Sequence, residues 1–492
     1  MVRTVGDSAV DVVHPLLVLS RGGARLAAGA RGWWERAPRD HRGPALFLAG
    51  SCALFLWLMP YGPWLAGAAA LGAAAWCGRE RPEPAAVEPE PDPEERAARL
   101  QALYEALVPC FAVAGDPRPE PLYCGDGSWE RAFTAYGFDA DGRLTHLLLR
   151  YPPCFPDGEP DARLRVQRLL CAKAGRDREF RFDWDEEANA LHVTALEPLP
   201  AGLCAQRFVV APGEMVLGFT DAEAVPRTLP VRDGDETRDV PPVVWRTGPR
   251  STEPHLLVLG QPGSGTTTLL RSVALQALQH GDVAIVDGSG AGEYACLAGR
   301  RGVLSVETTP VGALASLQWA AHETERRLLA AVRAREGADG AGPPGGGHRP
   351  LWVLVDRPAV LTHLARSEGR PDPQELLEVV LRHGRAARVS VALAEQFEGA
   401  EALAQAVRAY TRARVVLGCA TPEQVRAVLG EPPQTTPVRE VPPGRGYARL
   451  GTGPVLRLQV PATPDPYDEL AAEAHREAVA ALLPVPVVGV EE

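Results

Sequence analysis

A glycine-rich stretch with the chemistry of a phosphate-binding loop occupies residues 260–267, which read GQPGSGTT. Glycines at this spacing let backbone N–H groups curl around a phosphate, and a following helix adds the positive end of its dipole. Thr267 falls at the position whose hydroxyl ligates magnesium in such loops. We therefore expect ATP and Mg2+ to bind here. The residues expected to contact the nucleotide are Gly260, Gln261, Pro262, Gly263, Ser264, Gly265, Thr266, Thr267 and Thr268.

Thr266 is the departure from this chemistry, because it stands where a lysine bridges the β- and γ-phosphates and neutralises charge as the bond breaks. Lys173 is the only lysine in the chain, and the abundance of Ala, Gly, Pro and Arg indicates a GC-rich genome. Drift under that bias would favour arginine at this position rather than threonine. We expect nucleotide binding to persist and hydrolysis to be weakened or lost.

A second candidate site lies at Asp356, the last residue of the apolar run LWVLVD. Its carboxylate would hold the magnesium through water. A glutamate that polarises the attacking water is expected next, but the chain has Arg357, which cannot act as a base at neutral pH. Two interpretations stay open. Arg357 pairs with phosphate in place of the missing lysine, or both changes reflect lost hydrolysis.

Two further residues follow apolar strands of the same region. Gln396 ends RVSVALAEQ and is placed to sense a γ-phosphate, which makes it a catalytic candidate beside Asp356. Arg414 begins the run RVVLGC and is a candidate finger that reaches a neighbouring subunit's site. The alternative for Arg414 is an ordinary surface arginine.

The elements that must position these residues alternate between strands and helices. HLLVLG is a near-continuous apolar run of the kind a buried parallel strand needs, and TLLRSVALQALQH after the loop has helical spacing. VAIVDGS and VLSVETT add further strands, so we expect an α/β domain with a mainly parallel sheet.

These motifs together resemble the FtsK/SpoIIIE family of membrane-anchored DNA translocases. The resemblance rests on the order and spacing, along residues 254–420, of PHLLVLGQPGSGTTTLL, WAAHETERRLLAAVRAREG, LWVLVDRPAVL, RHGRAARVSVALAEQ and TRARVVLG. It implies a RecA-like P-loop NTPase motor, a hexameric ring around duplex DNA, and a role in chromosome segregation, cell division or DNA transfer. The net charge of −11 gives DNA contact no independent support.

The sequence departs from that family at three places and leaves alternatives open. Besides Thr266 and Arg357, the chain ends in LLPVPVVGVEE without the family's DNA-orienting winged helix, so we expect any DNA contact to lack sequence-directed polarity. One alternative is a non-hydrolysing scaffold or regulatory subunit, acting as a homo-oligomer or in a mixed ring with an active homologue. Another is a protein similar to type VII secretion ATPases.

Residues 43–78 contain no charged side chain and are interrupted by Pro60 and Pro63. This pattern predicts a transmembrane hairpin of two short helices over 44–78. Arginines flank both ends, so the positive-inside rule places both flanks and the motor in the cytoplasm, with the protein at the cell membrane. The alternative is a buried hairpin in a soluble fold.

The remaining segments complete the expected domain plan. A Pro/Glu-rich linker over 79–97 follows the hairpin and the cytoplasmic N-terminal segment 1–43. Strand-like runs with turn signals over 98–240 predict a small α+β domain, in which DWDEEANA is a solvated turn rather than a calcium loop. The irregular cysteine spacing favours free thiols over a zinc site. The motor domain is expected over 241–464, with a helix and tail over 465–492.

Overall fold

The structure is a computed structural model that describes residues 93–111, 129–175, 178–234, 236–336, 348–435 and 441–487. The chain divides into two compact units, Met1–Glu90 and Pro91–Glu492, and all of the described residues lie in the second. The N-terminal segment, the expected hairpin over 44–78 and most of the linker lie outside the described residues. Among the helices that are described, none has both the length and the apolar character needed to cross a membrane.

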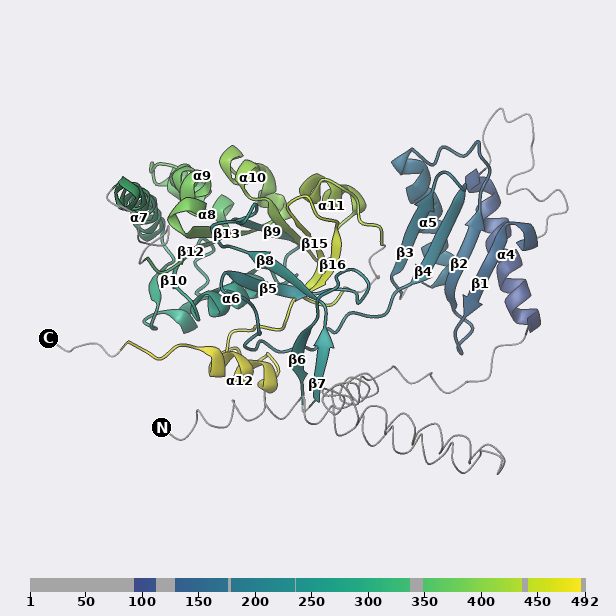
Figure 1. Ribbon diagram of the computed structural model, residues 1–492, viewed down its shortest axis with the longest axis horizontal. Helices are drawn as coiled ribbons and strands as arrows, with labels where there is room; N and C mark the ends of the chain where they lie inside the picture. Colours follow the sequence, from purple (N-terminus) through teal and green to yellow (C-terminus); the bar gives the residue numbers. More distant parts are fainter. Residues whose placement is uncertain are drawn as a thin grey trace, which may run out of the picture. The chain divides into compact units, whose positions relative to one another are not determined.

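The first part of the second unit is a four-stranded antiparallel sheet with two helices (Figure 1). Alternate residues of its strands are buried: Leu147 and Leu149 face the helices, while Arg150 is exposed. The strand order is β1-β2-β4-β3. The elements are α4 (Pro93–Phe111), η2 (Trp129–Arg131), β1 (Phe133–Phe138), β2 (Leu144–Arg150), α5 (Pro160–Ala174), β3 (Phe180–Asp185) and β4 (Ala190–Ala195).

The second part is built on a ten-stranded sheet in the order β11-β10-β12-β13-β9-β14-β15-β16-β5-β8. Neighbouring strands from β11 to β14 are parallel, and the remaining pairs are antiparallel. The expected α/β fold with a mostly parallel sheet is therefore confirmed. The strands are β5 (Glu214–Phe219), β8 (Pro242–Arg246), β9 (Leu256–Gly260), β10 (Asp282–Asp287), β11 (Val303–Glu307), β12 (Leu351–Asp356), β13 (Val389–Gln396), β14 (Ala413–Leu417), β15 (Arg445–Leu450) and β16 (Leu456–Gln459).

Strand β5 lies on the N-terminal side of the boundary expected at residue 240, and it belongs to this large sheet. It pairs with β16 and β8, and its run EMVLGF is almost entirely buried. A separate two-stranded ribbon, β6 (Leu229–Asp233) and β7 (Glu236–Val240), lies between β5 and β8 in the sequence. The large sheet thus draws strands from both sides of residue 240.

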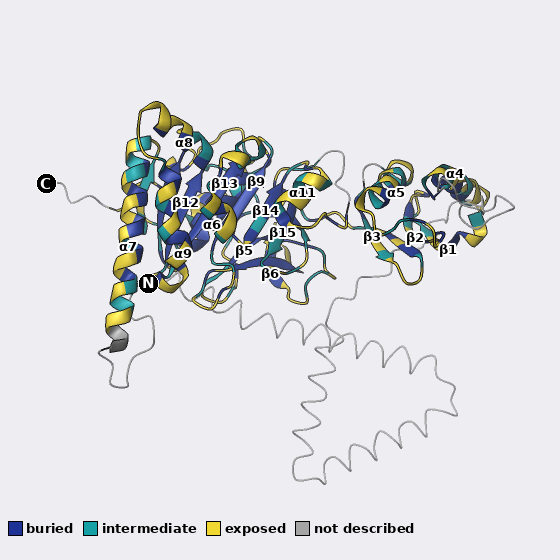
Figure 2. Cartoon of the chain, turned by 90° about the horizontal axis from the view of Figure 1, so that it is seen from above, coloured by how far each residue is buried: buried dark blue, intermediate teal, exposed yellow. Residues whose placement is uncertain are grey.

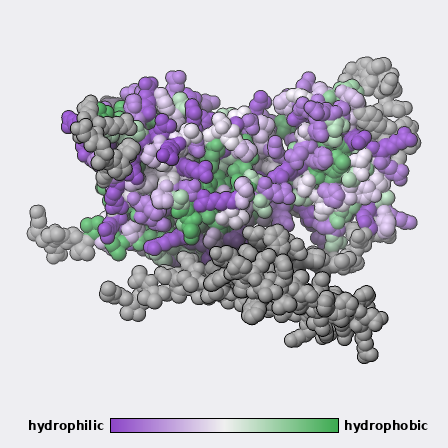
Figure 3. Space-filling view, viewed as in Figure 1, coloured by the Kyte–Doolittle hydropathy of each residue, from purple (hydrophilic) through white to green (hydrophobic). Residues whose placement is uncertain are grey.

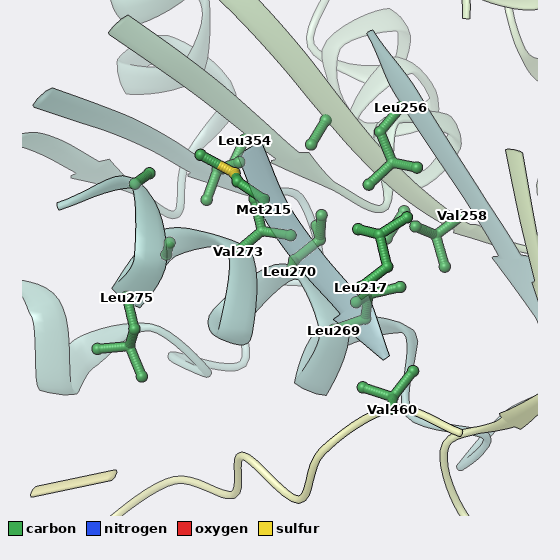
Figure 4. Packing of buried hydrophobic residues seen from close by; sticks show 14 of the residues in the cluster. Met215, Leu217, Leu256, Val258, Leu269, Leu270, Val273, Leu275, Leu354 and Val460 are labelled. Atoms are coloured by element: carbon green, nitrogen blue, oxygen red, sulfur yellow. The ribbon is translucent and has the colours of Figure 1, made fainter. Parts of the chain in front are cut away.

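Helices cover both faces of the parallel strands, because successive strand residues point to opposite faces. Leu256 and Val258 pack with α6, as the close view in Figure 4 shows, whereas Leu257 and Leu259 join the cluster formed with the helices of the other face. The helices are α6 (Thr266–Ala277), η3 (Ala295–Leu297), α7 (Pro310–Glu336), α8 (Pro358–Ser367), η4 (Pro373–Leu376), α9 (Leu377–Ala387), η5 (Phe397–Ala402), α10 (Gln405–Tyr410), α11 (Pro422–Leu429) and α12 (Glu473–Leu482).

Burial follows this layering. The strands are the most buried elements and the outer sides of the helices are exposed (Figure 2). On the face seen in Figure 3, hydrophilic residues predominate and smaller groups of hydrophobic residues lie between them. The carboxyl ends of β9, β12 and β13 come together at one edge of the sheet, and the predicted site residues other than Arg414 lie at that edge.

Candidate functional site

The glycine-rich loop is tightly curled over the end of β9. Gly263 and Gly265 have φ values of 75° and 98°, in the left-handed region that favours glycine. A Cβ atom on Gly260 would collide with Oγ of Ser264 and lie 2.7 Å from Cγ2 of Thr266. These positions therefore need glycine for this loop conformation.

Unused backbone donors line the loop. The N–H groups of Gly263 and Gly265 have no hydrogen-bond partner among the described residues, and the first N–H groups of α6 have no acceptor within the helix. Oγ of Ser264 is buried and likewise without a partner in the described part of the chain. Such a concentration of free donors at a helix N-terminus is an anion-binding arrangement.

The two predicted magnesium residues meet beneath this loop. Oγ1 of Thr267 donates a 2.7 Å hydrogen bond to Oδ2 of Asp356, and the Tyr294 hydroxyl donates to the same oxygen at 2.8 Å. Asp356 is 2% exposed, and burial raises its pKa to about 6, although both hydroxyl donors act in the opposite direction. Its Oδ1 is buried and unpaired with respect to the described residues. A hydroxyl beside a carboxylate with a spare oxygen fits Mg2+, which binds through few protein ligands and keeps several waters.

Asp287 is a buried neighbour of this site that the sequence reasoning missed. It ends β10 and lies directly opposite Asp356 in the register of the parallel strands. Its carboxylate accepts from N and Oγ of Ser289, at 3.1 and 2.6 Å, and from N of Gly292 at 3.0 Å. Asp287 therefore organises the loop that leads to Tyr294. The available signal was the run VAIVD, which ends in aspartate as LWVLVD does.

Tyr294 and Arg271 were also missed, and they connect the site to other parts of the fold. The Arg271 guanidinium lies 6.0 Å from the centre of the Tyr294 ring. Nη1 of Arg271 donates to the carbonyl of Thr463 at 2.9 Å, and Nη2 donates to the carbonyl of Glu293 at 2.6 Å. Tyr294 and Arg271 are both buried. Arg271 packs over the ring of Tyr294 and so helps to fix the side chain that donates to Asp356.

Thr266 does not supply the missing charge. Its side chain is 7% exposed, and its methyl group lies close to Gly260 at the base of the loop. Residues 260–268 contain no basic side chain. Positive charge at the phosphate site must therefore come from the backbone, from the metal or from another segment.

Arg357 is held in a left-handed backbone conformation, with φ 56° and ψ 51°. Its N–H donates to the carbonyl of Ala394 at 2.8 Å, and its own carbonyl lies 2.5 Å from where a Cβ on Gly288 would be. The side chain is half-buried and makes no hydrogen bond or ion pair with any described residue. Its charge acts to lower the pKa of both Asp356 and Glu395.

Gln396 lies where the sequence placed it, opposite Gly260 in the pairing of β13 with β9. The residue before it, Glu395, is an unexpected buried carboxylate. Its Oε2 accepts from N of Ala359 and its Oε1 from N of Gln396, both at 2.8 Å. Burial raises the pKa of Glu395. Both oxygens are occupied by backbone donors, so Glu395 joins the first turn of α8 to the end of β13.

Arg414 lies away from the loop of its own chain. It pairs with Leu257, near the start of β9, whereas the loop follows the end of that strand. Its guanidinium donates to the carbonyls of Thr411, Val428 and Arg408 at 2.9, 2.7 and 2.6 Å. A finger role toward a neighbouring subunit stays a prediction.

A curled glycine loop, a hydroxyl–carboxylate pair and a mostly parallel sheet are together the features of a P-loop fold. No protein-family model matches the chain. A curated relative is the FtsK domain-containing protein YdcQ of Bacillus subtilis (strain 168), 26% identical over 222 residues, which cover 44% of this chain and 45% of that protein. The match thus spans less than half the relative's length. The resemblance to FtsK/SpoIIIE proteins is confirmed by this relative.

Solved structures with partial likeness to this chain include one protein determined with ATPgS and two ATPases. The pCW3 conjugation coupling protein TcpA, in a monomer form with ATPgS, is 16% identical with a TM-score of 0.42, over 79% of this chain and 99% of that one. The type VII secretion ATPase EccC of Thermomonospora curvata is 20% identical with a TM-score of 0.39, over 58% and 32%. EssC of Geobacillus thermodenitrificans is 15% identical with a TM-score of 0.40, over 58% and 52%. These scores are low and describe partial likeness only.

Proposed function

We propose that this chain is a P-loop module of the FtsK/SpoIIIE class that binds ATP with Mg2+ and hydrolyses it little or not at all. The observation that carries this proposal is the 2.7 Å hydrogen bond between Thr267 and Asp356 beneath a loop rich in unpaired N–H groups. The arrangement keeps the binding half of the site, while Thr266 and Arg357 replace the residues that hydrolysis needs.

The residues present fit a magnesium nucleotide. The N–H groups of Gly263, Gly265 and the first turn of α6 would hold phosphate oxygens, and the Thr267 hydroxyl would ligate the metal. Asp356 would hold a metal-bound water through its unpaired Oδ1. When bound, the metal would neutralise charge between the β- and γ-phosphates.

Hydrolysis lacks a base, and the glycine loop itself carries no positively charged side chain. The methyl-packed Thr266 carries no ammonium to stabilise the transferring phosphoryl group. Arg357 presents a guanidinium, which has no acceptor atom and cannot polarise an attacking water as a carboxylate would. Glu395 does not replace the missing glutamate, because both of its oxygens already accept backbone N–H groups.

The proposal also covers the partners and the location that the family resemblance implies. We infer a cytoplasmic module anchored to the cell membrane through residues 44–78, associated with duplex DNA, in a homo-oligomeric or mixed ring that serves chromosome segregation, cell division or DNA transfer. The paired losses at Thr266 and Arg357 favour a second candidate within this class, a regulatory or scaffold subunit that works beside an active homologue.

Equilibrium binding to the purified full chain tests the proposed site. Fluorescent ADP and ATP analogues are titrated with and without Mg2+, and Asp356→Ala serves as the site variant. We expect saturable binding that Mg2+ strengthens, and we expect Asp356→Ala to remove the Mg2+ effect. The absence of saturable binding to the wild type would contradict a nucleotide site.

A further inference from the structure

We propose that Arg357 supplies the charge that the missing lysine would supply, by pairing its guanidinium with the terminal phosphate of a bound nucleoside triphosphate. This inference rests on the proposed function and names the regulation of that site. It predicts that the site distinguishes triphosphate from diphosphate through a residue outside the glycine loop.

The register of the strands places Arg357 at the edge of the sheet where the carboxyl ends of β9, β12 and β13 meet. Asp356 pairs with Ala394 of β13, and Ala394 pairs with Val258 of β9, the strand that leads into the loop. Two strand spacings, about 10 Å, therefore separate Asp356, at the end of β12, from Val258, two residues before the end of β9. The hydroxyl of Thr267 closes this gap by contacting Asp356 directly. The side chain of Arg357 thus starts one residue from the carboxylate that would hold the metal.

The backbone of Arg357 is held in an unfavourable conformation by contacts on both sides. Left-handed φ and ψ cost free energy for a residue with a Cβ, and persist where the surrounding structure enforces them. Here the Ala394 carbonyl accepts the N–H of Arg357, and the absence of a side chain at Gly288 makes room for its carbonyl. Such enforced residues concentrate at ligand-binding sites.

The Arg357 guanidinium is also uncommitted, in contrast to Arg271 beside the site and to Arg414 elsewhere in the sheet. Arg271 donates to the carbonyls of Thr463 and Glu293, and Arg414 donates to three carbonyls. Arg357 has no such partner within the described ranges, although its charge acts on two buried carboxylates, Asp356 and Glu395. A guanidinium is well suited to phosphate because it donates two parallel hydrogen bonds.

A structural role is the competing explanation, in which Arg357 only offsets the buried charges of Asp356 and Glu395. That role predicts equal effects on every nucleotide, whereas contact with the terminal phosphate predicts an effect confined to the triphosphate. The comparison of ADP with a slowly hydrolysed ATP analogue therefore separates the two.

The experiment titrates Mg2+ with ADP or with ATPγS into the full chain and its variants. Arg388→Gln is the matched control, because Arg388 is also half-buried and left-handed, with φ 56° and ψ 41°, but lies at the other end of β13. We expect Arg357→Gln to weaken ATPγS binding about tenfold or more, with ADP affinity changed less than about twofold. Arg388→Gln should change neither, and Arg357→Lys should keep part of the preference for ATPγS.

Equal weakening of both nucleotides by Arg357→Gln, or no weakening of either, would overturn this inference while leaving the nucleotide site intact. If the wild type binds neither nucleotide, the proposed function fails and this inference fails with it. Thermal melting of each variant shows whether it folds. If Arg357→Gln is unfolded, the charge-retaining Arg357→Lys decides. If this variant keeps part or all of the wild-type preference for ATPγS over ADP, the pairing is supported. If its affinities for ATPγS and ADP fall equally, the pairing is contradicted.

Discussion

Thr267 and Asp356 lie 89 residues apart in the sequence and are joined by a 2.7 Å hydrogen bond from Oγ1 to Oδ2. This contact links the first turn of α6, which directly follows the glycine loop, to the carboxylate at the end of β12. A hydroxyl–carboxylate pair of this kind fits Mg2+, which takes few protein ligands and keeps several waters.

Thr267→Val should remove the dependence of nucleotide binding on Mg2+, because valine keeps the shape of threonine without its hydroxyl. Thr362→Val is the control, since Thr362 makes a similar 2.7 Å hydrogen bond to Asp372 outside the site. Titration of Mg2+ at fixed nucleotide measures the effect. Equal Mg2+ dependence in the two variants would argue against Thr267 as a ligand.

Asp356→Asn should stabilise the metal-free protein at neutral pH. The folded pKa of Asp356, about 6, is above its ordinary value of 3.8, so its contribution to stability is present below pH 3.8 and is lost as the pH rises through 6. Asparagine removes the buried charge and can still accept from Thr267 and Tyr294. Above pH 6 the gain in the free energy of unfolding should be on the order of 3 kcal/mol.

Urea unfolding with a chelator at pH 7.5 and at pH 4 measures this difference. The gain should be large at pH 7.5 and shrink toward pH 4. A variant less stable than the wild type at pH 7.5 would contradict the buried-charge account of Asp356.

Tyr294→Phe should weaken magnesium-dependent nucleotide binding as well as stability, because it removes a 2.8 Å donor from Asp356. The stability loss should be about 1 kcal/mol, the usual net value of a hydrogen bond. Tyr447→Phe removes another buried hydroxyl, which accepts from Oγ1 of Thr435 at 3.0 Å. That control should lose comparable stability and keep wild-type binding, and calorimetry of both variants provides the comparison.

His255 should make the fold sensitive to acid. Burial lowers its pKa to about 4, and its Nδ1 accepts from N of Val391 at 3.0 Å. A depressed folded pKa contributes stability above the unfolded value of 6.5, and that stability is lost as the pH falls toward 4. His255→Leu should be less stable at pH 7.5, because it leaves the Val391 N–H without its acceptor.

Its stability should also fall less between pH 6.5 and 4.5 than that of the wild type, by about 2 kcal/mol. Denaturant unfolding across this pH range provides the measurement. Parallel pH profiles of the two proteins would show that His255 does not titrate with unfolding.

The sheet and the loop could be predicted because their signals are local. Apolar runs such as HLLVLG and LWVLVD predict buried strands, and the glycines of 260–265 follow one of them. The placement of Gln396 beside Gly260 also follows, because carboxyl ends of neighbouring parallel strands share one edge.

The surroundings of Asp356 could not be predicted, since they depend on which distant strands become neighbours. Asp287 faces Asp356 only through the pairing of β10 with β12, and Tyr294 reaches it from a loop after β10. Local spacing carries no information on such register. The same holds for β5, whose apolar run reads as part of an earlier domain but pairs at the far side of the large sheet.

Multiple-turnover hydrolysis by the purified full chain, with saturating Mg2+ and ATP and with or without duplex DNA, tests the central claim most directly. We predict turnover no higher than that of Asp356→Ala under conditions in which wild-type nucleotide binding is saturated. Repeated turnover that Asp356→Ala abolishes would show a working motor and contradict the account of a binding site that has lost hydrolysis.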